Sequence, residues 1–158
     1  MRKKIIGSVL DSTSPTSQEG WLDLEHLAQV ELTSENAVHP IEAALAAGLG
    51  PGWQAAQPGE QTIRFLFDEP QRLRRIHLVF DERERARTQE FVLRWSADTG
   101  QTCWEIVRQQ YNFSPPGTVR EVEDYGVELE GVTTLELSIV PDISGGDSCA
   151  SLAMMRLG

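Results

Sequence analysis

The stretch that decides the fold is Thr33-Ser-Glu-Asn-Ala-Val-His-Pro-Ile-Glu-Ala-Ala-Leu-Ala-Ala-Gly-Leu-Gly-Pro-Gly-Trp53. Residues 28–33 before it have the pattern of a strand, and its polar first third is typical of a turn. Pro40 then begins a short apolar helix that ends before Gly48, because proline fits the first helical turn and glycine favours the position just past the end. A Gly/Pro loop follows and ends at Trp53. This order predicts one short helix set between β-structure.

The rest of the chain alternates apolar and polar residues with the period of a β-strand. Leu135, Leu137 and Ile139 are the clearest case, and we expect them to be buried together. Similar segments are residues 60–67, 73–80, 89–96, 104–106, 127–129 and 152–154, separated by turn residues at 68–70, 98–100, 114–117, 130–131 and 144–147. About seven to nine short strands with one short helix predict an all-β antiparallel sandwich, with a jelly roll as its natural topology.

Composition restricts the partners. The 158 residues include 24 acidic and 14 basic side chains, a formal net charge of -10. A field of this sign disfavours nucleic-acid backbones and anionic membrane surfaces, so neither is expected as a partner. The apolar run after the basic N-terminus is too short for a signal peptide or a membrane span, which predicts a cytoplasmic protein. We expect an N-terminal strand or mobile arm over residues 1–20 and a single β-sandwich binding domain over residues 21–158.

Cysteine and histidine spacing gives no support for a metal or another cofactor. Cys103 and Cys149 match no metal-binding knuckle, and a disulfide between them would need an oxidising compartment. We expect two reduced thiols, each acting as a small apolar residue. His26 and His77 have no partners at ligand spacing, so no zinc site is predicted.

From residue 28 onward the chain resembles the galactose-binding-domain-like β-sandwiches, which include discoidin domains, coagulation-factor C-type domains and family 32 carbohydrate-binding modules. The first similarity is the short helix followed by Trp53. The second is the pair of segments 60–67 and 73–80 joined at Asp68-Glu-Pro70, which is similar to two adjacent strands and a tight turn. The third is residues 91–104, similar to a strand, a hairpin of the Ser-x-Asp-Gly kind and a Trp that opens the next strand. The resemblance implies a binding module.

The resemblance has one departure. Family members often bind a structural calcium through an Asp-Gly pair after the short helix and a Glu near the C-terminus. Residues 46–50 and the C-terminal strand lack both carboxylates. Calcium takes six to eight oxygen ligands, including carboxylates, so no calcium is expected at this loop.

Two candidate site residues flank the short helix. Trp53 either stacks on an apolar sugar face from its loop or folds back as a lid over the core, and we expect an exposed ring. His39 either caps the start of the helix or presents a nitrogen to a ligand hydroxyl. Trp95 and Trp104 fall on apolar strand faces and are expected in the core.

Further candidates lie in two polar segments. Arg85 and Arg87 belong to the charged run 81–88, which is either a solvated hairpin tip or the source of a guanidinium that binds a carboxylate or sugar oxygen. Tyr111 and Asn112 offer a flat ring and an amide, the composition of a small polar binding site. The alternative is that Tyr111 and Phe113 close the end of the sandwich.

The motifs of nucleophile elbows, phosphate-binding loops and zinc proteases are all missing from the sequence, so no enzyme is predicted. We expect a non-catalytic binding module that binds carbohydrate through loops at one end of the sandwich. The alternative is a cytoplasmic protein–protein interaction domain of the same fold. The sequence leaves the oligomeric state open.

Overall fold

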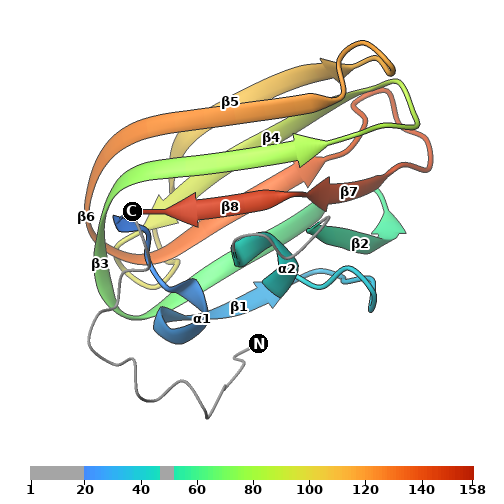
Figure 1. Cartoon of the computed structure of the whole chain (residues 1–158). Helices are drawn as coiled ribbons and strands as arrows, with labels where there is room; N and C mark the ends of the chain where they lie inside the picture. The colour runs from blue at the N-terminus through green and yellow to red at the C-terminus, as the bar shows by residue number, and fades with distance from the viewer. Residues whose placement is uncertain (1–19, 47–51) are drawn as a thin grey trace.

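The computed structural model describes residues 20–46 and 52–158, which form an antiparallel β-sandwich with two short helices (Figure 1). In chain order the elements are α1 (Leu24–Leu27), β1 (Ala28–Leu32), α2 (Glu42–Leu45), β2 (Trp53–Pro58), β3 (Gln61–Asp81), β4 (Arg87–Ser96), β5 (Trp104–Phe113), β6 (Arg120–Val140), β7 (Cys149–Leu152) and β8 (Met154–Leu157). The predicted jelly-roll sandwich is confirmed. The expected arm, apart from Gly20, and most of the loop for which no calcium was expected lie outside the described residues.

Two long strands, β3 and β6, pair antiparallel over nearly their whole length and bend together (Figure 1). Before the bend β3 also pairs with β1, and after it with β8; the C-terminal half of β6 pairs with β4, which pairs with β5. The two halves of this ribbon therefore belong to opposite layers. Phe80 near the end of β3 stacks on Phe91 of β4, with ring centroids 5.2 Å apart, so the core lies between the layers.

The bend keeps apolar side chains directed inward. Successive side chains of a strand point to opposite faces, so a change from odd to even inward positions needs an extra residue in the ladder. Phe65 is fully buried at an odd position and Ile76 at an even one. The register between β3 and β6 shifts three times between Leu66 and Arg75, which supplies this change.

Residues 68–70 and 130–131 form this bend instead of separate turns. The prediction of two strands joined by a tight turn at Asp68-Glu-Pro70 is wrong, because these residues continue within β3. Gly131 lies within β6 with φ +69°, a conformation that suits glycine at a bulge. The turn-forming residues therefore marked the positions where the chain changes direction. There the pairing of β3 with β6 continues through the change as a bulged bend, so no separate turn forms.

The core contains most of the expected residues. Leu135, Leu137 and Ile139 are all fully buried, as predicted. Trp95 packs against the core while partly exposed, but Trp104 is 56% exposed, so its core assignment is wrong. Trp104 begins β5, which lies at the edge of the sheet and has β4 as its neighbouring strand on one side. Cys103 is a free thiol but is exposed, so the expectation that it acts as a small apolar residue is wrong.

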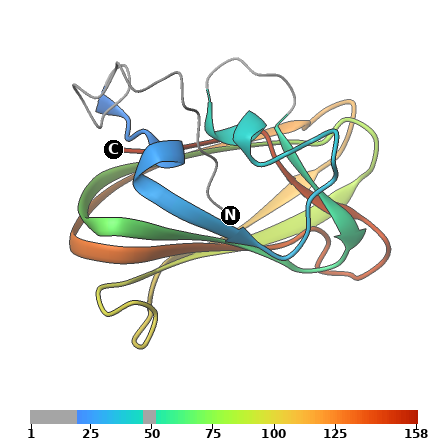
Figure 2. The same cartoon turned by 90° about the horizontal axis from the view of Figure 1, so that it is seen from below.

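Two helices are present where one was predicted. The expected helix is α2, and α1 is a single turn closed by the bond from the Leu27 N–H to the Asp23 carbonyl. One turn is too short for apolar periodicity to reveal. Both helices lie on the same side of the sandwich (Figure 2). Neither is long and apolar enough to cross a membrane, and the described residues contain no other α-helix.

The bend yields a stability prediction. Replacing Gly131 by Ala should cost about 1–2 kcal/mol, because an L-residue is strained at this positive φ, although the added Cβ would meet no atom within 4 Å. Gly126→Ala is the matched control: it lies on the same strand, has open space and no positive φ. This control should be neutral or stabilise by about 0.5 kcal/mol. Urea unfolding measures both, and equal losses would contradict the assigned bulge.

Candidate ligand-binding site

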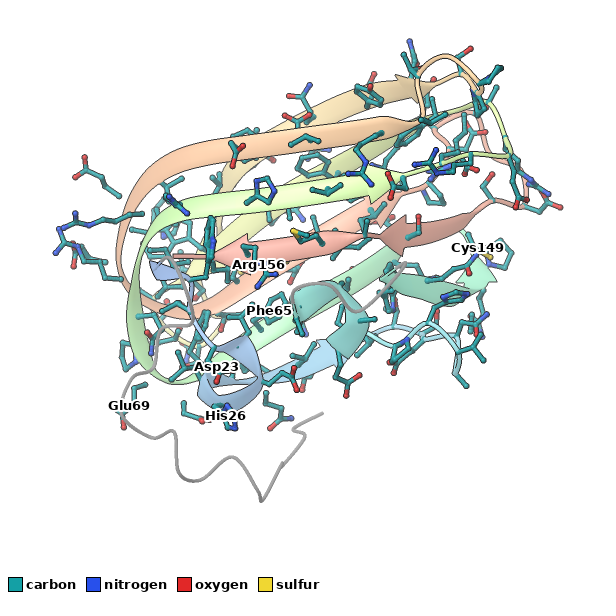
Figure 3. All side chains as sticks on the ribbon, viewed as in Figure 1. Asp23, His26, Phe65, Glu69, Cys149 and Arg156 are labelled. Atoms are coloured by element: carbon teal, nitrogen blue, oxygen red, sulfur yellow. The ribbon has the colours of Figure 1, made fainter. Side chains whose placement is uncertain are left out.

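The loops at one end of the sandwich surround a cavity of about 470 Å³, which we call the end cavity. Its walls come from residues 81–85, residues 147–149 and the turn that contains His39. Figure 3 shows Cys149, a lining residue, at the opposite end of the sandwich from Glu69 in the bend. The end cavity therefore lies where connections cross between the layers.

The charged run connects β3 to β4 and forms one wall. It is not a hairpin tip, because β6 lies between β3 and β4 in the sheet. Glu82 organises this connection: its Oε2 accepts the N–H groups of Glu84 (2.9 Å) and Arg85 (3.1 Å), and its Oε1 accepts from Arg87 Nε (2.6 Å). Desolvation opposes ionisation, but these three hydrogen bonds outweigh it and lower the pKa of Glu82. The carboxylate is thereby fixed in its charged form.

Arg87 lies beneath the end cavity and is 4% exposed. Its Nη1 donates to the Pro141 carbonyl (2.8 Å) and to Gln89 Oε1 (3.2 Å), and its guanidinium lies 4.8 Å from the centre of the Phe113 ring. Arg87 is not among the residues that line the cavity, although its partner Glu82 is. It holds Glu82 in place from below.

Two further ion pairs fix the wall carboxylates. Arg85 Nη1 donates to Asp147 Oδ1 at 2.6 Å, which ties the β3–β4 connection to the loop before β7. This bond lowers the pKa of Asp147 and raises that of Arg85. Asp81 accepts two bonds from Arg120, at 2.8 and 3.1 Å. Asp81, like Asp147, therefore reaches the cavity already paired with an arginine.

Trp53 is 1% exposed, so the expected exposed ring is wrong. It begins β2, and its Nε1 donates to the Ser34 carbonyl at 3.2 Å. The preceding Gly52 has φ +90°, and a Cβ there would lie 2.3 Å from the Leu152 carbonyl oxygen. The chain can pass this close only as glycine, and the passage turns the indole into the core. The burial of both Trp53 and Ala55 shows the alternation that could have revealed a strand here.

His39 lines the end cavity and its carbonyl accepts from the Gln54 N–H at 3.1 Å. The capping role considered for it belongs to another residue. Glu35 Oε2 accepts the N–H of Ile41, at the start of α2, at 2.8 Å. The ring of His39 thus remains available to the cavity.

Tyr111 and Asn112 lie in β5 rather than in a loop, and neither lines the end cavity. The Tyr111 hydroxyl donates to the Arg120 carbonyl at 2.9 Å, and its ring packs edge-on against Phe113. Asn112 accepts from Thr88. Tyr111 and Phe113 close this side of the sandwich, which is the alternative that the sequence left open.

Of the six candidate residues, the structure therefore brings His39, Trp53 and Arg85 together and places the other three elsewhere. Sequence reasoning missed the wall carboxylates, because an acidic chain offers many and nothing local marks Asp147 as the partner of Arg85. Among the described residues, no three His, Cys, Asp or Glu side chains are placed to hold a metal ion.

This architecture is the galactose-binding-like, discoidin-like β-sandwich of family 32 carbohydrate-binding modules. The chain is similar to the CBM32-3 module from a family 31 glycoside hydrolase of Clostridium perfringens (TM-score 0.61, 16% identity, covering 87% of this chain and 93% of the module). It is also similar to the family 32 module of C. perfringens NanJ in complex with galactose (0.56, 10%, 82% and 92%). A third similar chain comes from reduced XRCC1 bound to the DNA pol beta catalytic domain (0.57, 15%, 84% and 95%). No model of a known protein family and no curated protein sequence matches the chain.

The burial of Trp53 predicts a large effect on stability. Trp53→Ala should lower the free energy of unfolding by about 3–5 kcal/mol, the usual cost of truncating a buried aromatic side chain. Trp104→Ala removes the same side chain from an exposed position and should change stability by about 0.5 kcal/mol or less. Chemical denaturation of both variants tests this. Similar losses in the two would contradict the assigned burial of Trp53.

Proposed function

We propose that this chain is a non-catalytic carbohydrate-binding module and that its sugar lies in the end cavity. The single observation that carries the proposal is a cavity of about 470 Å³ at the loop end of the sandwich, whose wall contains hydrogen-bonding side chains, among them Glu82, Arg85 and Asp147, that ion pairs hold in place. Small-molecule sites typically measure ~300–1,000 Å³ and contain a few converging polar groups.

The wall chemistry supports a polyhydroxylated ligand. Sugar hydroxyls both donate and accept hydrogen bonds, and the cavity offers donors on Arg83 and Arg85 and acceptors on Glu84 and Asp147. The ion pair between Arg85 and Asp147 orders these two side chains before binding, which reduces the entropy lost on association. With Trp53 buried, binding depends on hydrogen bonds more than on ring stacking.

The protonation states favour binding over hydrolysis. A glycosidase needs a carboxylic acid whose pKa is raised so that it can donate a proton to the leaving oxygen. Glu82 and Asp147 show the opposite, because hydrogen bonds lower the pKa of each. These wall carboxylates are suited to accept hydrogen bonds from a bound sugar.

Arg85 provides the test. A glycan array should identify a ligand, and Arg85→Ala should weaken its binding about 10–100-fold, the value of one hydrogen bond to a charged group. Arg108→Ala is the matched control, because Arg108 is a similarly exposed arginine paired with Glu90 and Glu105 on the outer face of β4 and β5. Isothermal calorimetry should show unchanged affinity for this control. Equal effects of the two variants would remove the end cavity from the site.

Cys149 gives an independent measure of occupancy. A sugar in the end cavity should slow alkylation of Cys149, which lines it, and leave the exposed Cys103 unaffected. Mass spectrometry of iodoacetamide-treated protein reports both thiols in the same molecule. A bound sugar that protects neither thiol must lie elsewhere.

The second candidate function is a cytoplasmic protein-interaction domain. The observation that favours it is Trp104, a large aromatic side chain that is 56% exposed at the edge strand β5. Exposed tryptophans are frequent hot spots of protein interfaces. No ligand on a glycan array, together with a partner whose binding is lost in Trp104→Ala but kept in Arg85→Ala, would favour this function.

A further inference from the structure

A chain of hydrogen bonds leads from the interior of the sandwich to the end cavity. Glu121 Oε1 on β6 accepts from Gln89 Nε2 (3.1 Å), and Gln89 Oε1 accepts from Arg87 Nη1 (3.2 Å). Arg87 Nε donates to Glu82 Oε1 (2.6 Å), and Glu82 Oε2 accepts the N–H of Arg85. The three side chains behind Glu82 are deeply buried: Gln89 is 0%, Glu121 1% and Arg87 4% exposed.

Two atoms of this chain are buried without a hydrogen-bond partner among the described residues, Arg87 Nη2 and Glu121 Oε2. Arg87 Nη2 is a charged donor, and Glu121 Oε2 becomes a full acceptor when Glu121 is ionised; both side chains bond to Gln89. Leaving such groups unpaired costs free energy. Once Glu121 is ionised the two atoms are complementary, which allows a second arrangement in which the guanidinium bonds directly to Glu121 instead of to Glu82.

We infer that Arg87, Gln89 and Glu121 are positioning residues for the end cavity, and that Arg87 holds Glu82 and the backbone after it only while Glu121 is uncharged. One guanidinium serves two carboxyl groups. While Glu121 is neutral, the attraction of Arg87 is directed to Glu82. Once Glu121 is ionised it competes for Arg87, and the connection loosens. The inference rests on the proposed function only in taking the end cavity as the ligand site.

The surroundings of Glu121 keep it neutral near pH 7. Burial raises the pKa of Glu121 to about 9, and the neighbouring Glu123 adds to the effect, while Arg87 on β4 opposes it. Tyr125 also lies nearby on β6, and burial together with the neighbouring Glu123 raises the pKa of its hydroxyl. On β3, the register partner of Glu121 is the apolar Phe80. The charged form is therefore reached only in alkaline solution.

The test uses the intact chain without a sugar and takes the ratio of iodoacetamide alkylation rates at Cys149 and Cys103 as its readout. Cys149 lines the end cavity beside Arg85, and Cys103 is exposed outside it. In the wild type this ratio should stay constant near neutral pH and rise with a midpoint near pH 9, the pKa of Glu121. In Glu121→Gln it should stay flat, because the amide oxygen can still accept from Gln89 but cannot ionise.

Two further variants sharpen the test. Glu90→Gln makes the same chemical change on the outer face of β4, where Glu90 pairs with Arg108, and should keep the wild-type profile. Arg87→Lys keeps the charge but lacks the planar fork that reaches Glu82 and Gln89 together, so its ratio should be raised at every pH. Parallel profiles of the wild type and Glu121→Gln, or a wild-type ratio in Arg87→Lys, would overturn the inference.

Stability against pH provides a measurement that does not use the thiols. Because the folded pKa of Glu121 is raised from 4.5 to about 9, its contribution is fully present below pH 4.5 and is lost as the pH rises through about 9. The free energy of unfolding of the wild type should therefore fall relative to Glu121→Gln across this window. A constant difference would show that Glu121 is already ionised in the folded protein and would overturn the inference.

The two proposals fail separately. A chain that binds no sugar but shows the pH-dependent thiol ratio would refute the proposed function and support the positioning device. A chain that binds sugar in the end cavity with a flat ratio would do the reverse.

Discussion

The structure depends on one constraint, the bend of the ribbon formed by β3 and β6. A straight strand of 21 residues would span about 70 Å, whereas a compact chain of this length has a radius of gyration of about 15 Å. Bending places the two halves of each strand in opposite layers, so that Phe80 meets Phe91 across the core. The bulges at the corner keep the apolar side chains inward on both sides of it.

The position of the end cavity follows from that bend. One end of the sandwich is closed by the curved ribbon, so the connections that cross between layers gather at the other end (Figures 1 and 3). The run 81–88 makes one such crossing and carries its charges into the wall. In a chain with a net charge of -10, the arginines that pair with Asp81, Glu82 and Asp147 prevent the wall from becoming a purely repulsive acidic cluster.

The fold accommodates more than one kind of partner, so the site has to decide the function. The similar solved structures include a module in complex with galactose and a chain from a protein–protein complex. In this chain Trp53 is buried in the core, while the donors and acceptors that wall the end cavity form the recognition surface that we propose. The hydrogen-bond chain from Glu121 through Gln89 and Arg87 to Glu82 connects the interior of the sandwich to the wall of the end cavity.

The sequence by itself determined the all-β class, the short helix and the inward faces of the strands, since these depend on local periodicity that survives in any sandwich. Leu135, Leu137 and Ile139 are the clearest example. Only the tertiary structure decided that residues 68–70 bend instead of turning, that Trp53 points inward and that Arg85 meets Asp147. Each of these outcomes depends on a segment far away in the sequence: the pairing of β6 with β3, the close approach of Leu152 to Gly52, and the loop before β7. Local patterns specify which residues seek burial, but the contacts that form a site depend on which distant segments the fold brings together.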